Sequence, residues 1–140
     1  FSKRLDFNVT VIDERENAFD NFAHEGVQLI NKKHHRAFEG LQFDHEIFLA
    51  VVTHNHAYDR EIVAHCAKRP HAYLGMIGSK RKVEIARKSL LATGDFSDEM
   101  LSKIDWPMGV EIEAQTPDEI AISILAKLIE TRAKLERANT

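Results

Sequence analysis

The sequence lacks the features that mark secreted, membrane-spanning or nucleic-acid-binding chains. It has one cysteine among 140 residues, which excludes an internal disulfide framework and suits a reducing compartment. No apolar run approaches the roughly 20 residues that cross a bilayer, and the first residues do not form a basic segment followed by an apolar leader. We therefore expect a cytoplasmic protein without membrane association. The formal net charge of −3 lacks the basic excess typical of general nucleic-acid binders, so no nucleic-acid partner is predicted.

What the sequence does contain is an alternation of short apolar runs and helical patterns. The strands predicted from β-branched and apolar runs are residues 8–12, 27–30, 47–52 and 73–77. The helices predicted from apolar spacing and end signals are residues 16–24, 59–68, 80–92, 97–104 and a long last helix capped by Thr116. Residues 31–43 are polar and predict a loop. The alternation favours an α/β fold, a Rossmann-like three-layer domain with a mostly parallel sheet.

The first part of a nucleotide-binding Rossmann unit is missing from the pattern. Such a unit opens with a strand, a glycine-rich turn and a helix. Residues 1–7 look like the tail of that helix running into the second strand. We therefore predict a single Rossmann-like domain over residues 1–140 that is N-terminally incomplete, with the first strand and its glycine-rich turn before residue 1.

The most informative segment is the strand, turn and helix start over residues 72–82. Its apolar run ends in Gly78 and Ser79. Three cations follow at once at the start of the predicted helix: Lys80, Arg81 and Lys82. A helix N-terminus presents free backbone N–H groups and the positive end of the macrodipole, so the segment predicts an anion site at the ligand-binding edge of the sheet. The alternative is a solvated helix start with ordinary surface cations, which oppose the macrodipole at a small cost.

Two histidines follow the most apolar predicted strand. If the backbone stays extended, His54 and His56 point the same way, where they would bind a ligand, hold a metal or shuttle protons. Asp59 and His65 are candidate further ligands, but no spacing compels them, and two histidines fall short of a zinc site, so no metal is predicted. The alternative is a polar pair that ends a strand, with Thr53 satisfying the backbone of the loop.

Asp13 and Arg15 close the first predicted strand. An acidic residue at this place in a Rossmann unit holds a ribose hydroxyl, so both residues are candidate ligand contacts. The alternative is a strand end that faces solvent, with Arg15 paired to a neighbouring acid.

The single cysteine invites a role in sulfur transfer. However, Cys66 shares one helix face with Tyr58 and Ile62 at a spacing of four residues. Because free cysteines are usually buried, we predict a core thiol rather than a sulfur carrier.

Five segments together resemble the C-terminal domain of the XdhC/CoxI family, whose members are accessory factors for xanthine dehydrogenase and related molybdenum hydroxylases. The segments are residues 9–15, 51–56, 75–82, 107–112 and 116–124. The likeness covers most of residues 8–130 in the same order. It implies a Rossmann-like domain that binds and protects molybdenum cofactor (molybdopterin), with its terminal sulfur, and delivers it to the hydroxylase.

The resemblance also implies partners and a wider set of binding residues. It implies a chaperone more than a catalyst, with a xanthine dehydrogenase-type molybdenum hydroxylase and a sulfur-donor desulfurase as partners. The candidate cofactor-binding residues are then Asp13, Arg15, Thr53, His54, His56, Gly75, Gly78, Ser79, Lys80, Arg81, Lys82 and Gly109. The chain departs from the family at two places: Asn55 stands where the family commonly has Asp, and Glu113 where it often has glycine.

Two other interpretations stay open. The first is an NAD(P)-binding oxidoreductase domain, which Asp13 favours and which the sequence upstream of residue 1 would decide. The second is a dimerisation or scaffold domain. The apolar stripe of the last helix has spare positions beside Ile120, Ile124 and Leu128, and a missing first strand would expose a sheet edge, so we predict a homo-oligomer.

Overall fold

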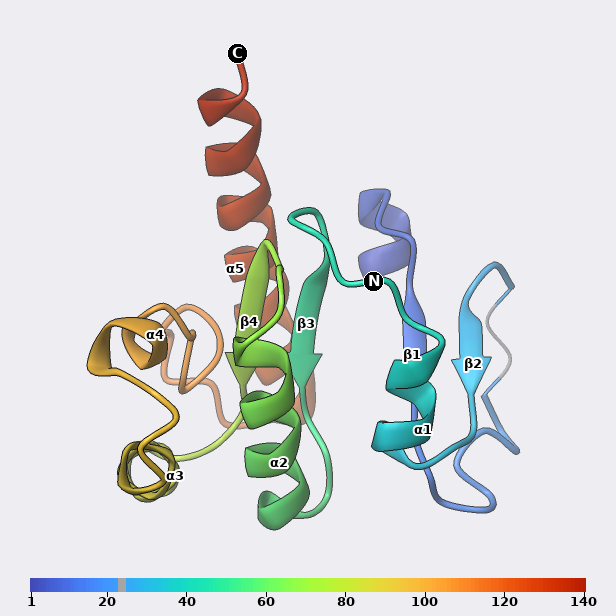
Figure 1. Cartoon of the computed structure of the whole chain (residues 1–140). Helices are drawn as coiled ribbons and strands as arrows, with labels where there is room; N and C mark the ends of the chain where they lie inside the picture. The colour runs from blue at the N-terminus through green and yellow to red at the C-terminus, as the bar shows by residue number, and fades with distance from the viewer. Residues whose placement is uncertain (23–24) are drawn as a thin grey trace. The chain divides into compact units, whose positions relative to one another are not determined.

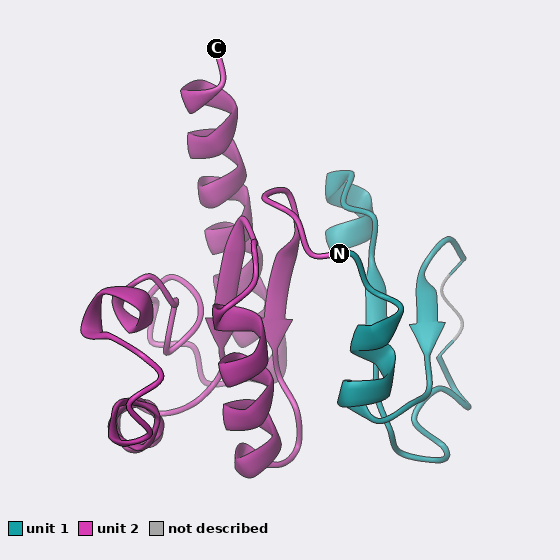
Figure 2. Cartoon of the chain, in the orientation of Figure 1, with its two compact units in different colours: residues 1–42 teal, residues 43–140 magenta. Residues whose placement is uncertain are grey.

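The computed structural model describes residues 1–22 and 25–140. The chain divides into two compact units, Phe1–Gln42 and Phe43–Thr140, and each is described by itself (Figure 2).

Unit 1 is built around one parallel strand pair. Its elements are the 3-10 helix η1 (Ser2–Leu5), strands β1 (Thr10–Ile12) and β2 (Gln28–Ile30), and helix α1 (His34–Glu39). The strands pair in parallel from Thr10 opposite Gln28 to Ile12 opposite Ile30, which confirms both predicted strands of this unit.

Two predictions for unit 1 are wrong. Residues 16–21 form turns, in which the Phe22 amide donates to the Phe19 carbonyl at 3.0 Å, three residues back rather than the four of an α-helix. Residues 23 and 24, the end of the predicted helix, lie outside the described residues. Conversely, the predicted loop over residues 31–43 contains α1. This helix has no side-chain cap, but it buries Ala37, so packing stabilises a helix that its polar sequence does not announce.

Unit 2 contains the second parallel strand pair and the longer helices (Figure 1). Its elements in chain order are β3 (Phe48–Val51), α2 (His56–Ala67), β4 (Tyr73–Met76), α3 (Lys80–Ala92), α4 (Asp98–Ser102) and α5 (Pro117–Ala138). β3 and β4 pair in parallel from Phe48 opposite Tyr73 to Val51 opposite Met76. In Figure 1, α2 lies in front of the two strands and α5 behind them. β4 is buried along its whole length, as its apolar run predicts. β3 is only partly buried, because Ala50 is exposed and Phe48 and Leu49 are half-buried, so the burial on both faces that its unbroken apolar run predicts is wrong for this strand.

β4 is the most buried strand of unit 2, and all four of its residues are buried. β3 pairs with one of its edges. The segment after α4 covers the other, because the Asp105 amide donates to the Leu74 carbonyl at 2.9 Å and the Met108 amide donates to the Met76 carbonyl at 2.9 Å. The core of the unit includes Val63, Leu74 and Leu101, which are almost fully buried.

The helix ends of unit 2 follow from local hydrogen bonds. α3 has the predicted bounds, and the Ser79 side chain caps it by accepting from the Lys82 amide. α5 opens with the predicted capping box of Thr116 and Glu119. α2 begins three residues earlier than predicted, because Asn55 is an N-cap whose side chain accepts from the Ala57 and Tyr58 amides. None of the helices in the described ranges is long and apolar enough to cross a bilayer.

Candidate functional site

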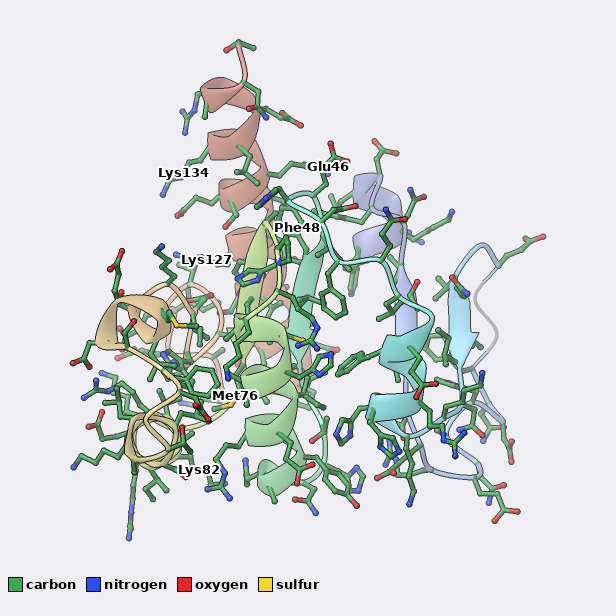
Figure 3. The ribbon with its side chains drawn as sticks, in the orientation of Figure 1. Glu46, Phe48, Met76, Lys82, Lys127 and Lys134 are labelled. Carbon is green, nitrogen blue, oxygen red and sulfur yellow. The ribbon has the colours of Figure 1, made fainter. Side chains whose placement is uncertain are left out.

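The carboxyl ends of β3 and β4 bring two of the predicted segments to one edge of unit 2. Because the two strands are parallel and in register, the segment after Val51 and the segment after Met76 leave the sheet on the same side. In Figure 3, Met76 marks this end of β4, and Lys82 of α3 lies just beyond it. This is the edge at which α/β sheets bind ligands.

The loop between β3 and α2 is organised by a buried carboxylate. Asp59, which is 0% exposed, accepts through Oδ1 from the Thr53 amide at 3.0 Å and from the Thr53 hydroxyl at 2.6 Å. The Thr53 hydroxyl also lies 2.8 Å from the Asn55 carbonyl. The Thr53 side chain therefore satisfies the loop backbone, which is the alternative to a ligand-binding role given for it above. Asp59 holds the loop in place.

The two histidines of this loop have different surroundings. The extended segment that is predicted to carry both of them ends at Asn55, because Asn55 caps α2 and His56 is already the first residue of that helix. His54 is exposed and its ring stands edge-on to the Tyr58 ring at 6.2 Å. His56 faces α3, and its Nε2 atom lies 2.8 Å from Lys82 Nζ.

The start of α3 supplies the charge of the site. The Lys80 and Arg81 amides have no acceptor among the described residues, as expected for the first positions of a helix. Lys80 and Arg81 are exposed, and Lys80 Nζ lies 3.7 Å from Glu111 Oε1, a contact between two side chains that are each more than 80% exposed. Such an ion pair holds Lys80 only weakly. The contact between Lys82 and His56 joins the two predicted segments.

A pocket of about 430 Å³ lies beside the start of α3. Its lining comes from the end of β4, the loop after α4 and the start of α5: Ile77, Gly78, Lys80, Pro107, Met108, Gly109, Val110, Glu111, Ile112, Glu113, Ala114, Ile120 and Ser123. The lining is mostly apolar, and its charged residues are Lys80, Glu111 and Glu113.

Packing alone requires glycine at Gly75 and Gly109, the two glycines that only the family resemblance singles out as binding residues. Gly75 is buried in β4, where a Cβ atom would come within 2.8 Å of the Met108 side chain. Gly109 has a φ of 108°, and a Cβ atom there would overlap Ser123 Oγ of α5. Gly109 also lines the pocket, whereas Gly75 lies in the strand behind it.

Asp13 and Arg15 lie in unit 1 and pair with each other. Arg15 Nη2 lies 2.6 Å from Asp13 Oδ2, and Arg15 Nε lies 3.1 Å from Asp13 Oδ1. This pair raises the pKa of Arg15 through its hydrogen bond and charge contact with Asp13. The Asn31 side chain donates to the Asp13 and Arg15 carbonyls, which ties the end of β1 to the residue after β2.

Cys66 is buried in α2, as predicted, with 1% of its surface exposed. Desolvation raises the pKa of its thiol to about 12, although nearby Arg69 acts in the opposite direction. A thiol of this kind is protonated and unreactive at neutral pH. Among the described residues, no group of three or more histidine, cysteine or acidic side chains is placed to hold a metal ion.

The strand, helix and strand order in parallel register, with polar residues gathered at the carboxyl edge, defines an α/β domain of the Rossmann type. The chain matches the family model described as the XdhC Rossmann domain over residues 1–128. The protein therefore belongs to the XdhC Rossmann domain family, which confirms both the predicted family and the predicted fold class.

Three similar proteins are all longer than this chain. It is 34% identical over 96 residues to the uncharacterized protein YqeB of Escherichia coli (strain K12), a match that covers 69% of this chain and 17% of YqeB. It is 29% identical over 108 residues to a probable xanthine dehydrogenase subunit of Bacillus subtilis (strain 168), covering 77% of this chain and 30% of that protein. The crystal structure of a xanthine dehydrogenase from Bacillus halodurans superposes with a TM-score of 0.78 at 27% identity, covering 96% of this chain and 38% of that chain.

Two of these three relatives carry the name xanthine dehydrogenase, so the chain is related to proteins of that system. It spans less than a third of the length of the two curated relatives.

Proposed function

We propose that this domain is part of an accessory and maturation factor that binds molybdenum cofactor and helps to insert it into a xanthine dehydrogenase-type molybdenum hydroxylase. The observation that carries the proposal is the edge where β3 and β4 end, with a capped helix N-terminus, three consecutive cations and a pocket of about 430 Å³ together. The phosphate of the cofactor would bind at the N-terminus of α3, and its pterin would occupy the pocket.

The charge and donors of this edge fit a phosphate. The Lys80 and Arg81 amides point out of the first turn of α3 without an acceptor among the described residues. The side chains of Lys80, Arg81 and Lys82 then add positive charge that the macrodipole alone disfavours. An anion at this point satisfies the amides and offsets the repulsion between the cations.

The role is that of a carrier rather than a catalyst, performed in the cytoplasm. A carrier needs an exposed binding edge from which a partner can take the ligand, and Lys80, Arg81, Lys82 and His56 are all exposed. The hydroxylase would receive the cofactor by direct docking, and a sulfur-donor desulfurase would be a second partner. Self-association through α5, where Ile122 and Ile129 are exposed, stays a prediction.

An NAD(P)-binding oxidoreductase domain is the second candidate. The observation in its favour is the position of Asp13 directly after β1, where a Rossmann acidic residue holds a ribose. In unit 1, however, the Asp13 carboxylate is engaged by the Arg15 guanidinium through both oxygens. A ribose hydroxyl would have to compete with this charge-assisted pair.

The deciding experiment is a titration of the chain with isolated molybdenum cofactor and, separately, with NAD and NADP. The test variant is Arg81→Ala with Lys82→Ala. Loss of two charge-assisted contacts should weaken cofactor binding about tenfold or more. The matched control is Lys88→Ala with Lys103→Ala, which removes the same charge from the end of α3 and from the segment after α4.

Equal affinity of the wild type and the Arg81/Lys82 variant would overturn the site. Binding of NAD or NADP without binding of molybdenum cofactor would favour the oxidoreductase interpretation instead.

A further inference from the structure

The two carboxylate oxygens of Asp59 differ in their hydrogen bonds. Its Oδ1 atom accepts both Thr53 hydrogen bonds and thereby holds the loop. Its Oδ2 atom is the buried side-chain polar atom that has no hydrogen-bond partner within the described residues. A fully buried carboxylate oxygen without a donor is costly, so its retention calls for a partner that is engaged only in another state.

The group that faces Oδ2 is the ring of His56. Nδ1 of His56 lies 3.6 Å from Asp59 Oδ2, just beyond hydrogen-bond distance. On the other side of the ring, Nε2 lies 2.8 Å from Lys82 Nζ. Two charged side chains thus face the ring from its two sides, Asp59 from α2 and Lys82 from α3.

The contact with Lys82 determines which ring nitrogen carries the proton. An ammonium group only donates hydrogen bonds, so His56 Nε2 must be the acceptor. The neutral ring then carries its proton on Nδ1, directed at Asp59 Oδ2. In this state the lone pair of Nε2 accepts from Lys82, so of the His56 and Lys82 side chains only Lys82 carries a positive charge.

We propose that His56, Lys82 and Asp59 form a proton-coupled receptor for a phosphate-type oxyanion, in which Asp59 is the positioning residue. When the oxyanion arrives, the Lys82 ammonium turns from Nε2 to the anion, and a proton from solvent adds to Nε2. The imidazolium then donates from Nε2 to the oxyanion and from Nδ1 to Asp59 Oδ2. This inference rests on the proposed function for the presence of an anion at this edge, and it adds the proton and the role of Asp59.

Anion binding and protonation of His56 are coupled through the charges of His56, Lys82 and Asp59. Without an anion, a protonated His56 would stand beside the Lys82 ammonium, and the two like charges would repel. With an anion between them, both cations are favoured, and the buried Asp59 carboxylate balances the imidazolium from behind. Anion and proton therefore bind together, and each raises the affinity for the other.

The test is ¹⁵N NMR of the histidine side chains at pH 7.5, with sulfate as the probe. Sulfate neither gains nor loses a proton in this range, so any change of protonation belongs to the protein. Without sulfate, His56 should show the neutral pattern with the proton on Nδ1. At saturating sulfate it should show the imidazolium pattern, while His45, which precedes β3 at the opposite edge, keeps its signals.

The variant Asp59→Asn tests the positioning role. The amide oxygen can still accept from Thr53, but a carboxylate no longer faces Nδ1, so sulfate should bind at least several-fold more weakly and His56 should remain neutral. The wild-type spectra decide the proposal even if this variant does not fold. A wild-type His56 with its proton on Nε2, or one that stays neutral with sulfate bound, overturns it.

The outcomes separate this inference from the proposed function. Sulfate that shifts the Lys82 amide and leaves His56 neutral overturns the receptor but keeps the anion site. Sulfate that shifts neither overturns both. A protonated His56 in a chain that does not bind molybdenum cofactor supports the receptor and refutes the proposed function.

Discussion

At the scale of single residues, Glu113 shows why a departure from the family pattern matters. It has a φ of 56°, in the left-handed region, and it stands where the family often has glycine. A non-glycine residue with this φ costs roughly 1–2 kcal/mol. A glycine at the same position would avoid that cost but would lose about 0.5–1 kcal/mol more in conformational entropy on folding, which offsets part of the gain. The loop around the pocket thus keeps the conformation that glycine favours, even though this chain has Glu at that position.

Glu113→Gly should therefore raise the free energy of unfolding, by up to about 1 kcal/mol, because it relieves the left-handed strain. Urea unfolding followed by circular dichroism measures the change. The matched control is Glu111→Gly in the same loop, a residue outside the positive-φ positions, so that only the entropic cost of glycine applies. If Glu113→Gly were less stable than the wild type, the strain would not exist.

The asparagine of the Thr-His-Asn-His segment is the milder departure. Asn55 caps α2 by accepting from the Ala57 amide at 2.8 Å. Aspartate and asparagine are about equally good at this position, because the carbonyl or carboxylate oxygen does the capping. The difference from the family therefore leaves the local structure intact.

The buried thiol of Cys66 predicts a dependence of stability on pH. Its pKa is raised to about 12 in the folded chain, against about 8.5 for an unfolded cysteine. Between these values the unfolded state loses a proton that the folded state keeps, so the free energy of unfolding should fall as pH rises. The slope approaches about 1.4 kcal/mol per pH unit.

Urea unfolding at several pH values from about 8.5 to 10 measures this slope. The pH range ends at about 10 because Tyr73 contributes to the slope above it. The pKa of Tyr73 is also raised, by desolvation and by its hydrogen bond to Asp105, so above the ordinary tyrosine pKa of about 10 the unfolded state loses a proton that the folded state keeps. Cys66→Ala should lose the slope whatever its absolute stability. A variant that keeps the full slope would show that another group is responsible.

At the scale of elements, the capping box of α5 predicts a measurable contribution to stability from side chains outside the core. The Thr116 side chain accepts from the Glu119 amide at 3.1 Å, and Glu119 Oε1 accepts from the Gln115 and Thr116 amides at 2.9 and 3.1 Å. These backbone donors lower the pKa of Glu119. Backbone donors at the start of a 22-residue helix are thus satisfied by two side chains.

Thr116→Ala should lower the free energy of unfolding by about 1 kcal/mol, within a range of roughly 0.5–2 kcal/mol for lost N-caps. The loss should appear as an earlier urea midpoint with an unchanged slope. Thr116→Ser retains the accepting hydroxyl and is expected to stay close to the wild type. An alanine variant as stable as the serine variant would contradict a role for the cap.

The elements that sequence patterns predict well are those whose ends carry their own signals. α3 and α5 begin after side-chain caps, and their starts are where the sequence predicts them. The errors occur where such signals are absent or ambiguous. The predicted helix over residues 16–24 has apolar spacing but forms turns, and α1 has no side-chain cap yet forms around buried Ala37.

α2 is an intermediate case. Asn55 is a good N-cap in the sequence, but it stands inside a polar segment that also looks like the end of a strand. The sequence pattern therefore predicts a helix start at Asp59, whereas the helix begins at His56. This error affects function more than fold, because it puts His56 in an extended segment with His54 instead of on a helix that faces α3.

At the scale of the whole molecule, parallel pairing explains why distant segments serve one site. His56 and Lys82 are 26 residues apart, yet their side chains meet at 2.8 Å because β3 and β4 are adjacent and point the same way. The sequence predicts this meeting in outline, since the carboxyl ends of parallel strands share an edge. The pocket lined by Gly109 and Ser123 is different, because it requires the loop after α4 to return along β4.

The sequence by itself determined the α/β class, the family, the cap of α3 and the cationic start of that helix. All of these depend only on local residue types and their spacing. Only the tertiary structure decided that Asp59 is buried with one oxygen that has no partner among the described residues, and that His56 stands between it and Lys82. Burial and contact across elements depend on how strands and helices pack, and that information is distributed over the whole unit rather than carried by any one segment.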